Sequence, residues 1–586
     1  MLFTMFVKMG DKEQILFSKR WVAKEAVDKT ASERLSKELN INTVFANLLL
    51  QRHIDTFDRA RAFFRPSLHQ LHDPFLMKDM EKAILRIEQA MAAKEKILIY
   101  GDYDVDGTTA VTTVFAFFNS IYEHMDFYIP DRYAEGYGIS YKGIDWAIEN
   151  GYSLIIALDC GIKSIAHVEY AKEKGVEFII CDHHHPGEEV PDATAILNPK
   201  QINCNYPFKE LSGCGIGYKL IQGYSIKNNL PEEKAQECLD LVAVSISADI
   251  VPIVDENRVL TYFGLKKLSE MPNNGLRALL EYSTKKMDLT VSDVVFSIGP
   301  RINAAGRIAD AKDSVRLMLT KCPIEAKNFA ELINVHNDER RSFDTNITEQ
   351  ALAVISNSKE MLHRKSTVVF NPAWHKGVIG IVASRLIEKY HRPTVVLTES
   401  NGMATGSARS VPGFDLYHAV ETCSDLLEQF GGHTHAAGLT MKLENVPEFI
   451  ERFEKIVAET IAEKSMAPEV EYDIELPMRC INAKFMGILK QFAPFGPGNM
   501  NPVFMTRNVW DNGYGSIVGE NHLRLSLMQE SLHKPMKGIA FGQAHHFDRI
   551  ATGVSFDICY TLEENHFNDS VSLQLNVKDI KFADQR

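Results

Sequence analysis

The residues best suited to chemistry in this sequence are carboxylates and imidazoles that directly follow short apolar runs. The runs and the side chains after them are KILIY before Asp102, Asp104 and Asp106, SLIIAL before Asp159, and VEFIIC before Asp182, His183 and His184. Open parallel sheets form their sites where the carboxyl ends of strands meet, so we expect these side chains to lie together. Such a cluster of like charges repels itself unless cations neutralise it.

The types of ligand atom narrow the choice of metal. Carboxylate oxygens and imidazole nitrogens without thiolates suit Mn²⁺ or Mg²⁺ better than a structural zinc. Taken alone, the pattern DxDxDG at residues 102–107 also fits a calcium loop or an acidic turn, although the glutamate that ends an EF-hand loop is missing. The sequence contains no GxSxG, no GxxxxGK[ST] and no Cys/His pair that would support acyl or nucleoside-triphosphate chemistry.

Apolar runs separated mostly by helix-like segments predict the fold that positions these residues. The runs are KILIY, MDFYIP, SLIIALDC, VEFIICD and ATAILNP, all after Lys94. Buried strands that alternate with helices predict a parallel sheet covered on both faces, and therefore an α/β domain. The helical stretch from Glu325 to Ser356 predicts a connector between two lobes.

The other segments predict a multidomain chain, which a length of 586 residues also favours. Helical spacing between Trp21 and Ile87 predicts a helical lead-in, and short strand-like runs after Ala467 predict a β-barrel such as an OB-fold. The expected domains are a helical lead-in (1–75), the α/β catalytic domain (76–280), a long helical connector (281–360), a smaller α/β domain (361–465) and an OB-like nucleic-acid-binding barrel (466–586).

Charge and cysteine usage exclude several classes of protein. The formal net charge is −13, so any binding of nucleic acid must be local. Between His363 and Ser410, seven Lys or Arg oppose two acidic residues, which fits a positive groove or a solvated basic face. The nine cysteines form no CxxC pair, and neither a secretion signal nor a membrane-spanning run is visible. We therefore expect a cytoplasmic protein with reduced thiols.

Four motifs resemble those of the DHH phosphoesterase superfamily, in the same order and at compatible spacing. They are Asp104 and Asp106 in GDYDVDG, Asp159 in LDCG, the triplet Asp182-His183-His184, and Asp249 in SADIVP. The resemblance implies two divalent cations, Mn²⁺ or Mg²⁺, with Asp159 bridging both ions. It assigns Asp104 to one ion, and Asp106, His183 and Asp249 to the other. It also implies that His184 faces the substrate phosphate as a donor or acid, so the catalytic set is Asp159, Asp182 and His184, while Asp102 and Asp182 orient their neighbours.

Tyr100 departs from the pattern of part of this superfamily. Some relatives, such as its inorganic pyrophosphatases, carry a metal-binding histidine four residues before the first ligand aspartate, where this chain has Tyr100. We therefore expect one metal to be bound more weakly, or water to replace that ligand. Because the other ligands are all present, we expect an enzyme and not one of the superfamily's replication-fork scaffolds that have lost metal ligands.

Further motifs resemble the RecJ family within this superfamily over nearly the whole chain. They are RYAEGYG, SGCGIGYKL, GPRINAAGR, WHKGVIGIVASRL, GSARS, GGHTHAAG and PFGPGN, of which GGHTHAAG resembles the signature of the DHHA1 domain. The resemblance implies a 5′ to 3′ exonuclease specific for single-stranded DNA, which releases nucleoside 5′-monophosphates in DNA repair and recombination. It implies a helicase and a single-strand-binding protein as partners, and we expect a monomer. The alternative is a DHH phosphodiesterase for short oligonucleotides or cyclic dinucleotides.

The same motifs supply candidate contacts to nucleic acid. Arginines such as Arg301 and Arg409 carry the planar donor fork that suits phosphate oxygens, although Arg385 also fits a helix surface. The glycines of GGHTHAAG predict a phosphate site at the start of a following helix, with His433 as an added donor, or else a tight strand-to-helix turn. The full set expected to bind nucleic acid is Arg132, Arg301, Asn303, Arg307, His375, Arg385, Arg409, Ser410 and His433. Exposed aromatics of the barrel would stack bases.

Overall fold

The computed structural model describes residues 4–9, 12–285, 287–567 and 570–585. The chain forms two units. We call Thr56–Arg340 with Gln491–Met500 the central unit, and Met1–Asp55, Arg341–Lys490 and Asn501–Arg586 the terminal unit. No helix in the described ranges is both long and apolar enough to cross a membrane.

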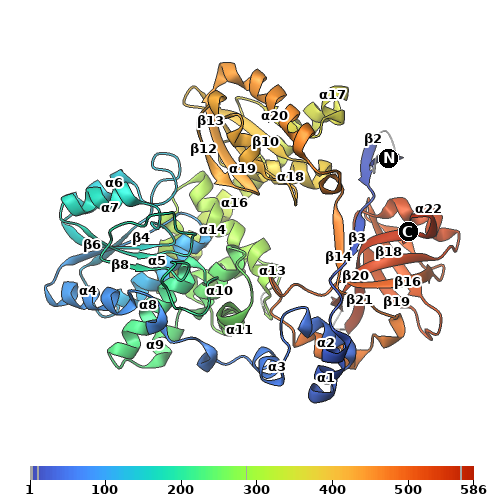
Figure 1. The fold of residues 1–586 in the computed structure, drawn as a ribbon, viewed down its shortest axis with the longest axis horizontal. Coiled ribbons are helices and arrows are strands. Elements are labelled where there is room, and N and C mark those ends of the chain that lie inside the picture. Colours follow the sequence, from blue (N-terminus) through green and yellow to red (C-terminus); the bar gives the residue numbers. More distant parts are fainter. Residues whose placement is uncertain (1–3, 10–11, 286, 568–569, 586) are drawn as a thin grey trace. The chain divides into compact units, whose positions relative to one another are not determined.

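A five-stranded parallel sheet forms the core of the central unit, in the order β5-β4-β6-β7-β8 (Figure 1). Its strands are β4 Lys96–Gly101, β5 Met125–Tyr128, β6 Tyr152–Leu158, β7 Glu177–Cys181 and β8 Ala195–Leu197. The order reverses at β4, because the chain goes first to β5 on one side and then to β6 on the other. The carboxyl ends of β4 and β6 therefore form a switch point, where open α/β sheets bind their ligands.

Helices cover both faces of this sheet, as the unbroken apolar runs predict. Ile97 and Ile99 of β4 pack in one core with α4 Met80–Ala92, α5 Val105–Asn119, α8 Gly213–Lys227 and α10 Leu239–Ala248. Leu98 and Tyr100, which alternate with them, pack in a second core with α6 Tyr141–Glu149 and α7 Ile165–Glu173. The predicted covered parallel sheet is confirmed.

The central unit also contains further helices. These are α3 Phe57–Phe64, α9 Glu232–Gln236, α11 Asp255–Glu270, α12 Asn274–Leu280, α13 Val291–Asp293, α14 Gly299–Ile308 and α15 Lys312–Leu319, with a π-helical turn Val294–Ile298 between α13 and α14. The 34-residue α16 Pro323–Ser356 is the predicted connector, and the chain passes from one unit to the other within it.

The terminal unit contains a second α/β layer, which confirms the smaller α/β domain. Its sheet has the order β12-β13-β11-β10-β9, with β9 Thr367–Phe370, β10 Thr394–Ser400, β11 Met403–Arg409, β12 Leu427–His433 and β13 Ala436–Lys442. One face packs against α19 Leu416–Glu421 and α20 Val446–Thr460. The other face packs against α18 Ile379–Tyr390 and the end of α16. The short α17 Lys359–His363 precedes this sheet.

A closed β-barrel forms the C-terminal part of the terminal unit, as predicted. Its strands are β15 Ile474–Glu475, β16 Phe504–Asp511, β17 Ser516–Val518, β18 His522–Met528, β19 Met536–Ala540, β20 Phe556–Phe567 and β21 Ser570–Phe582. They follow the order β15-β16-β20-β21-β19-β18-β17, and an additional pairing of β16 with β18 closes the barrel. Two helices, α21 Ala483–Lys490 and α22 Phe547–Ala551, accompany it. Closure removes the open edges that a flat sheet would expose.

The start of the chain is not purely helical, and this part of the prediction is wrong. The first described elements are β1 Thr4–Met9, β2 Lys12–Phe17 and β3 Arg20–Ala23, and α1 Lys29–Leu39 and α2 Thr43–Leu50 follow them. β3 pairs in parallel with β14 Glu469–Tyr472. A strand of four residues whose partner lies far away in the sequence leaves no periodic signal that a local pattern could detect.

Candidate functional site

The loop after β4 places three carboxylates at the amino end of α5. Asp104 caps this helix, and its carboxylate accepts a hydrogen bond of 2.9 Å from the Gly107 N–H. Asp102, immediately after the strand, accepts from the Tyr103 N–H at 2.7 Å. Burial raises the pKa of Asp104, and repulsion from Asp106 raises it further. In the absence of cations, the folded site therefore disfavours this negative charge.

Asp106 lies in the first turn of α5 and is held by α8. Its carboxylate accepts from the Gly213 N–H at 2.7 Å, from the Cys214 N–H at 2.8 Å and from the Ser245 hydroxyl at 2.7 Å. The N–H groups at a helix start are natural partners for an anion. Gly213 also has to be a glycine, because a Cβ there would lie 2.6 Å from that of Asp159. The SGCG motif thus allows α8 to approach both carboxylates.

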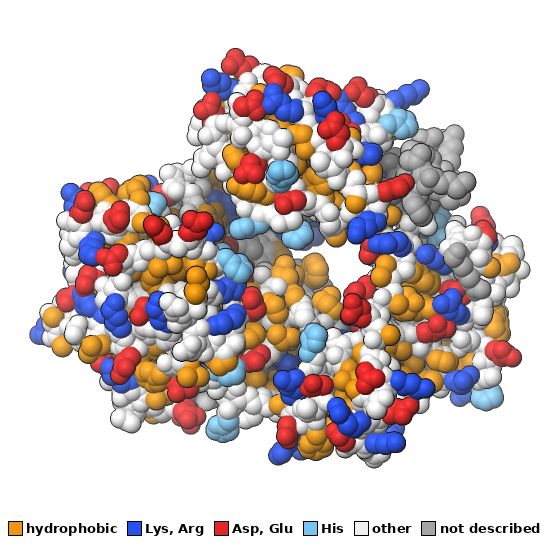
Figure 2. All heavy atoms as spheres, viewed as in Figure 1, with side chains coloured by type: hydrophobic (Ala, Val, Ile, Leu, Met, Phe, Trp, Pro, Cys, Tyr) orange, Lys and Arg blue, Asp and Glu red, His pale blue; other side chains and the backbone are white. Residues whose placement is uncertain are grey.

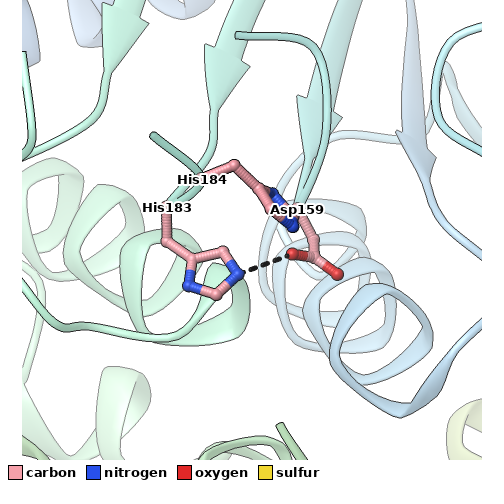
Figure 3. Close-up of side chains that lie close together, drawn as sticks. All are labelled: Asp159, His183 and His184. Carbon is pink, nitrogen blue, oxygen red and sulfur yellow. Dashed lines mark ion pairs between the residues drawn. The ribbon is translucent and has the colours of Figure 1, made fainter. Parts of the chain in front are cut away.

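Asp159 follows β6 directly and points toward His183 (Figure 3). Its backbone is left-handed, with φ +58°, and its carboxylate is buried. Oδ1 lies 3.3 Å from Nε2 of His183. Burial raises the pKa of Asp159 well above its usual value, and the neighbouring Asp106 and Asp104 raise it further.

Asp182 and His184, both after β7, form a hydrogen-bonded pair. Oδ1 of Asp182 lies 2.7 Å from Nδ1 of His184, and Oδ2 accepts from the Ile162 N–H at 2.9 Å. Burial opposes the charge on Asp182, but the hydrogen bonds and charge of His184, together with the Ile162 N–H, outweigh burial and lower the pKa of Asp182. Burial likewise opposes the charge on His184, yet Asp182 raises the pKa of this imidazole. The pair therefore favours a carboxylate beside an imidazolium.

His183 is the centre of the cluster. Its Nε2 lies 3.6 Å from the carboxylate of Asp249 and 3.9 Å from that of Asp106. Asp249 caps the carboxyl end of α10 and is brought to the sheet by this helix. Burial, followed by repulsion from Asp106, raises the pKa of Asp249 to about 9. Two groups of residues each offer donor atoms that lie within 4.8 Å of one another. One group is Asp106, His183 and Asp249, and the other is Asp159, His183 and His184.

The donor set fits divalent cations. Among the described residues, Oδ1 of Asp159 and Nδ1 of His183 are buried without a hydrogen-bond partner. Asp104, Asp159 and Asp249 have raised pKa values because each is buried beside like charge. Cations would remove the penalty of like charge and would give Oδ1 of Asp159 a partner, and the oxygen and imidazole donors match the preferences of Mn²⁺ and Mg²⁺. The structure brings the predicted carboxylates and His183 together. Asp104 lies beside them but belongs to neither group of close donor atoms in the described part.

Tyr100 is committed to packing and to a neighbouring loop. Its hydroxyl donates to the Gly138 carbonyl at 3.0 Å and accepts from the Ser140 N–H at 3.1 Å. The ring is buried and stacks on Tyr128 at a centroid distance of 5.4 Å. Tyr100 therefore anchors the RYAEGYG segment beside the carboxylates. The position of this segment thus depends on the residue that stands where some relatives have a metal-binding histidine.

The RYAEGYG segment lies over the site. The guanidinium of Arg132 lies over the Tyr103 ring, 4.8 Å from its centroid. The Tyr137 hydroxyl lies 3.4 Å from Nε2 of His184, and the two rings meet edge to face. Sequence reasoning singled out Arg132 here but missed Tyr137.

Helix α14, which carries GPRINAAGR, lies alongside the carboxylates. Its start approaches Ala248, next to Asp249, and Gly306 near its end lies against the Tyr103 carbonyl. Asn303 and Arg307 are four residues apart and so share one face of this helix. Arg301 differs, because its guanidinium donates to Asn334 of α16 at 3.0 Å and to the carbonyls of Ser297 and Tyr282. These bonds fix α14 within the central unit.

The other five predicted nucleic-acid contacts belong to the terminal unit. The exposed guanidinium of Arg385 forms a bidentate pair with buried Asp344, which fits the helix-surface alternative. Arg409 donates to the Ser407 hydroxyl and the Ala408 carbonyl. His375 stacks on Phe343 at 5.0 Å, and the Ser410 hydroxyl donates to the Phe414 carbonyl. His433 is exposed at the end of β12.

The predicted phosphate site in GGHTHAAG is wrong in its geometry. No helix follows the glycines, and the motif forms a hairpin in which His433 of β12 pairs with Ala436 of β13. The alternative of a strand-to-helix turn is wrong for the same reason. Glycine and alanine lack the apolar alternation that marks a strand, so the pattern concealed the hairpin.

The basic stretch 363–410 does not form one positive groove. Arg392 is buried and donates to the Thr367 hydroxyl at 2.7 Å, while Arg364 pairs with Glu451 at 2.6 Å. Figure 2 shows acidic and basic side chains interspersed over the visible face. Several of these cations therefore serve the fold of the small α/β layer.

Two further features near the site escaped sequence reasoning. Ser245 donates to Asp106 and lies on α10 one turn before Asp249, a helical spacing that could have revealed it. The PFGPGN segment packs against the loop after Asp249, where the Ile253 N–H donates to the Pro497 carbonyl at 2.7 Å. Nothing in the local sequence predicts this contact across more than 240 residues.

Comparison with known proteins agrees with this architecture. Residues 96–246 match the DHH family N-terminal domain, residues 363–459 the DHHA1 domain, and residues 472–579 the RecJ OB domain. The single-stranded-DNA-specific exonuclease RecJ of Bacillus subtilis is 36% identical, over 96% of this chain and 70% of the relative. The protein of the same name from Escherichia coli is 31% identical, over 86% of this chain and 90% of the relative.

Solved structures show the same fold. RecJ from Thermus thermophilus in complex with Mn²⁺ superposes with a TM-score of 0.83 at 25% identity, over 96% of this chain and 79% of that chain. An exonuclease RecJ bound to manganese is 30% identical, with a TM-score of 0.59 over 68% of this chain and 98% of that chain. Both structures contain the type of divalent cation that the donor set fits. With these domains, and at this identity over most of its length, the chain belongs to the RecJ family.

Proposed function

We propose that this chain is a 5′ to 3′ exonuclease that hydrolyses single-stranded DNA with the help of two divalent cations and releases nucleoside 5′-monophosphates. The observation that carries the proposal is that Asp106, His183 and Asp249 offer donor atoms within 4.8 Å of one another, as do Asp159, His183 and His184. The names of the relatives supply the substrate and the strand preference. In this proposal the exonuclease acts in DNA repair and recombination in the cytoplasm.

The carboxylates and His183 hold the cations in this proposal. Asp159 would contribute to the binding of both cations, Asp104 to one, and Asp106, His183 and Asp249 to the other. When bound, the cations supply an activated water for in-line attack on phosphorus and neutralise charge on the leaving 3′ oxygen. Asp106 is held by α8 and Ser245, which orients its carboxylate before substrate arrives.

His184 acts on the phosphate. Its Nδ1 is occupied by Asp182, so Nε2 is the atom that faces the Tyr137 hydroxyl and the substrate side. The negative charge of Asp182 favours the protonated imidazole, which donates a hydrogen bond or a proton to a phosphate oxygen. Asp182 thus orients and charges His184, while Asp102 supports the loop that carries Asp104 and Asp106.

Each unit by itself offers candidate contacts to a strand. Arg132, Asn303 and Arg307 in the central unit offer donors to phosphate oxygens close to the carboxylates. His375, Arg385, Arg409, Ser410 and His433 offer donors in the terminal unit. Arg301 contributes by holding α14 in place. On the barrel, Tyr514 and Phe541 are 78% and 58% exposed and supply surfaces on which bases stack.

The deciding experiment offers the purified chain four substrates with Mn²⁺, Mg²⁺ or a chelator. These are a single strand labelled at its 5′ end, the same strand labelled at its 3′ end, a duplex, and a cyclic dinucleotide. We expect the 5′-labelled strand to release labelled mononucleotide first, the duplex to resist, and chelation to stop the reaction. Preference for the cyclic dinucleotide would favour the alternative, a DHH phosphodiesterase for small substrates. The proposed partners are a helicase and a single-strand-binding protein, and sedimentation tests the proposed monomer.

A further inference from the structure

Ile250 follows Asp249 directly and holds an unusual backbone conformation. Helix α10 ends at Ala248 with Asp249 as its cap, and Ile250 has φ +62°. Its side chain is apolar and 61% exposed. The left-handed conformation is a true outlier for a β-branched residue, and glycine is the usual residue at this position after a helix.

Stability alone does not account for isoleucine at this position. A left-handed β-branched residue is strained, and an exposed apolar side chain gains nothing from burial. Glycine would remove the strain, and a polar residue would suit the exposure. Strained residues persist where the surrounding structure fixes them, and they cluster at functional sites.

The loop after Ile250 fixes its conformation. The Ile253 N–H donates to the Pro497 carbonyl at 2.7 Å, and a Cβ on Gly496 would collide with Ile253. Asn257 donates to the Pro252 carbonyl at 3.0 Å. Because Val251 is also buried, the loop cannot relax by swinging outward. The PFGPGN segment therefore holds Ile250 in the strained, exposed position.

Within the donor group Asp106, His183 and Asp249, the most exposed member directly precedes Ile250 in the chain. The Asp249 side chain is 28% exposed, whereas those of Asp106 and His183 are 1% and 10% exposed. Solvent, and hence a phosphate, reaches this group of donors at Asp249. A nucleotide whose phosphate lies there brings its sugar and base against the rim that the next residue forms.

We propose that the side chain of Ile250 packs against the nucleoside of a nucleotide whose phosphate binds through the cation that Asp249 would hold, and so favours nucleotides over simple phosphates. The inference rests on the proposed phosphodiester-hydrolysing function and adds the residue that recognises the nucleoside. Packing of an apolar side chain on a nucleoside needs no base-specific hydrogen bond, so this contact suits an enzyme that digests every sequence.

The test compares two ligands by calorimetry in Mn²⁺, using the full chain: 2′-deoxyadenosine 5′-monophosphate and inorganic phosphate. We expect Ile250→Gly to weaken nucleotide binding about tenfold, as the loss of one apolar contact implies, and to leave phosphate binding unchanged. Its melting temperature should stay the same or rise, because glycine relieves the strain. Ile250→Asn, which tolerates the left-handed backbone, should lose the nucleotide preference equally, whereas Ile250→Val should keep most of it.

Lys94→Gly is the matched control. Lys94 also follows a helix cap in the central unit, with φ +56°, and it is exposed. Relief of strain there should alter stability alone. The proposal is overturned if the wild type binds the nucleotide no more tightly than phosphate, or if Ile250→Gly weakens both ligands equally or neither. Failure of the wild type to digest single strands would instead contradict the proposed function, which this binding test does not require.

Discussion

Nδ1 of His184 lies 2.7 Å from Oδ1 of Asp182, and the same carboxylate oxygen accepts from the His184 backbone N–H at 3.1 Å. The Ile162 N–H occupies the other oxygen. The carboxylate is therefore held on three sides, and it fixes both the orientation and the charge of the imidazole.

Asp182→Asn should lower kcat about 10- to 100-fold while leaving strand affinity nearly unchanged, since the partner that orients His184 is weakened but the strand contacts remain. Because Asp182 raises the pKa of His184, its loss should lower that pKa. The protonated imidazole would then disappear at a lower pH. The pH–rate profile of single turnovers should therefore fall off earlier on its alkaline side. An unshifted profile would contradict the role of Asp182.

Asp159→Ala should abolish turnover while strand binding, measured by fluorescence anisotropy, changes little. In the proposed function Asp159 would hold the cations, whereas most contacts to the strand would come from arginines and aromatic side chains elsewhere. Asp192→Ala removes an exposed carboxylate that pairs with Lys172 and serves as the control. Equal loss of binding and turnover in Asp159→Ala would show that the cations hold the strand.

Cations should stabilise the folded protein, and Asp159→Asn should reveal why. The pKa of Asp159 is raised by burial and by neighbouring carboxylates, so its charge destabilises the cation-free fold. This penalty is absent below the unfolded pKa and develops as the pH rises toward the folded pKa. At neutral pH with a chelator, Asp159→Asn should therefore melt at a higher temperature than the wild type. With Mn²⁺ the order should reverse, because only the wild type binds the ions fully. Calorimetric melting curves measure both.

The parts of the site that the sequence predicts are those with a local signal. Asp104, Asp159 and His183 each follow a buried apolar run, and a parallel sheet must bring the ends of such runs to one edge. The roles of Asp106 and Ser245 depend on α8 and α10, whose approach is set by tertiary packing. The spacing of Ser245 and Asp249 places both on one face of α10, but no spacing in the chain encodes the approach of α8 and α10 to Asp106.

The errors in the predicted fold have a similar cause. The hairpin at His433 is rich in glycine and alanine, which give no alternation of apolar and polar residues. Strand β3 pairs with β14, and more than 440 residues separate the two strands in the sequence. Local patterns predict the type of an element better than its partners.

Arg258→Met should destabilise the central unit by about 3 kcal/mol, because several buried carbonyls lose their donor at once. The Arg258 guanidinium donates to the carbonyls of Phe63, Phe492 and Ala493, at 3.0, 2.9 and 2.9 Å in turn. It also lies over the Phe63 ring, 3.7 Å from its centroid. Urea unfolding measures the loss, and Arg258→Lys should retain part of the stability. A loss below about 0.5 kcal/mol would mean that water replaces the guanidinium at these carbonyls.

Tyr514→Ser with Phe541→Ser should weaken the binding of long single strands about tenfold or more, since stacking on one aromatic ring contributes about 1–3 kcal/mol per base. Hydrolysis of a dinucleotide should not change, because the carboxylate cluster belongs to the other unit. Val554→Ser, at an apolar side chain that is 40% exposed beside the barrel, is the control. Substitution is preferable to deletion of the barrel, because deletion from residue 466 onward would also remove Gln491–Met500, which packs within the central unit. Competition binding with strands of increasing length checks the prediction. Equal affinity for long strands in the variant and the wild type would show that bases do not stack on these two rings.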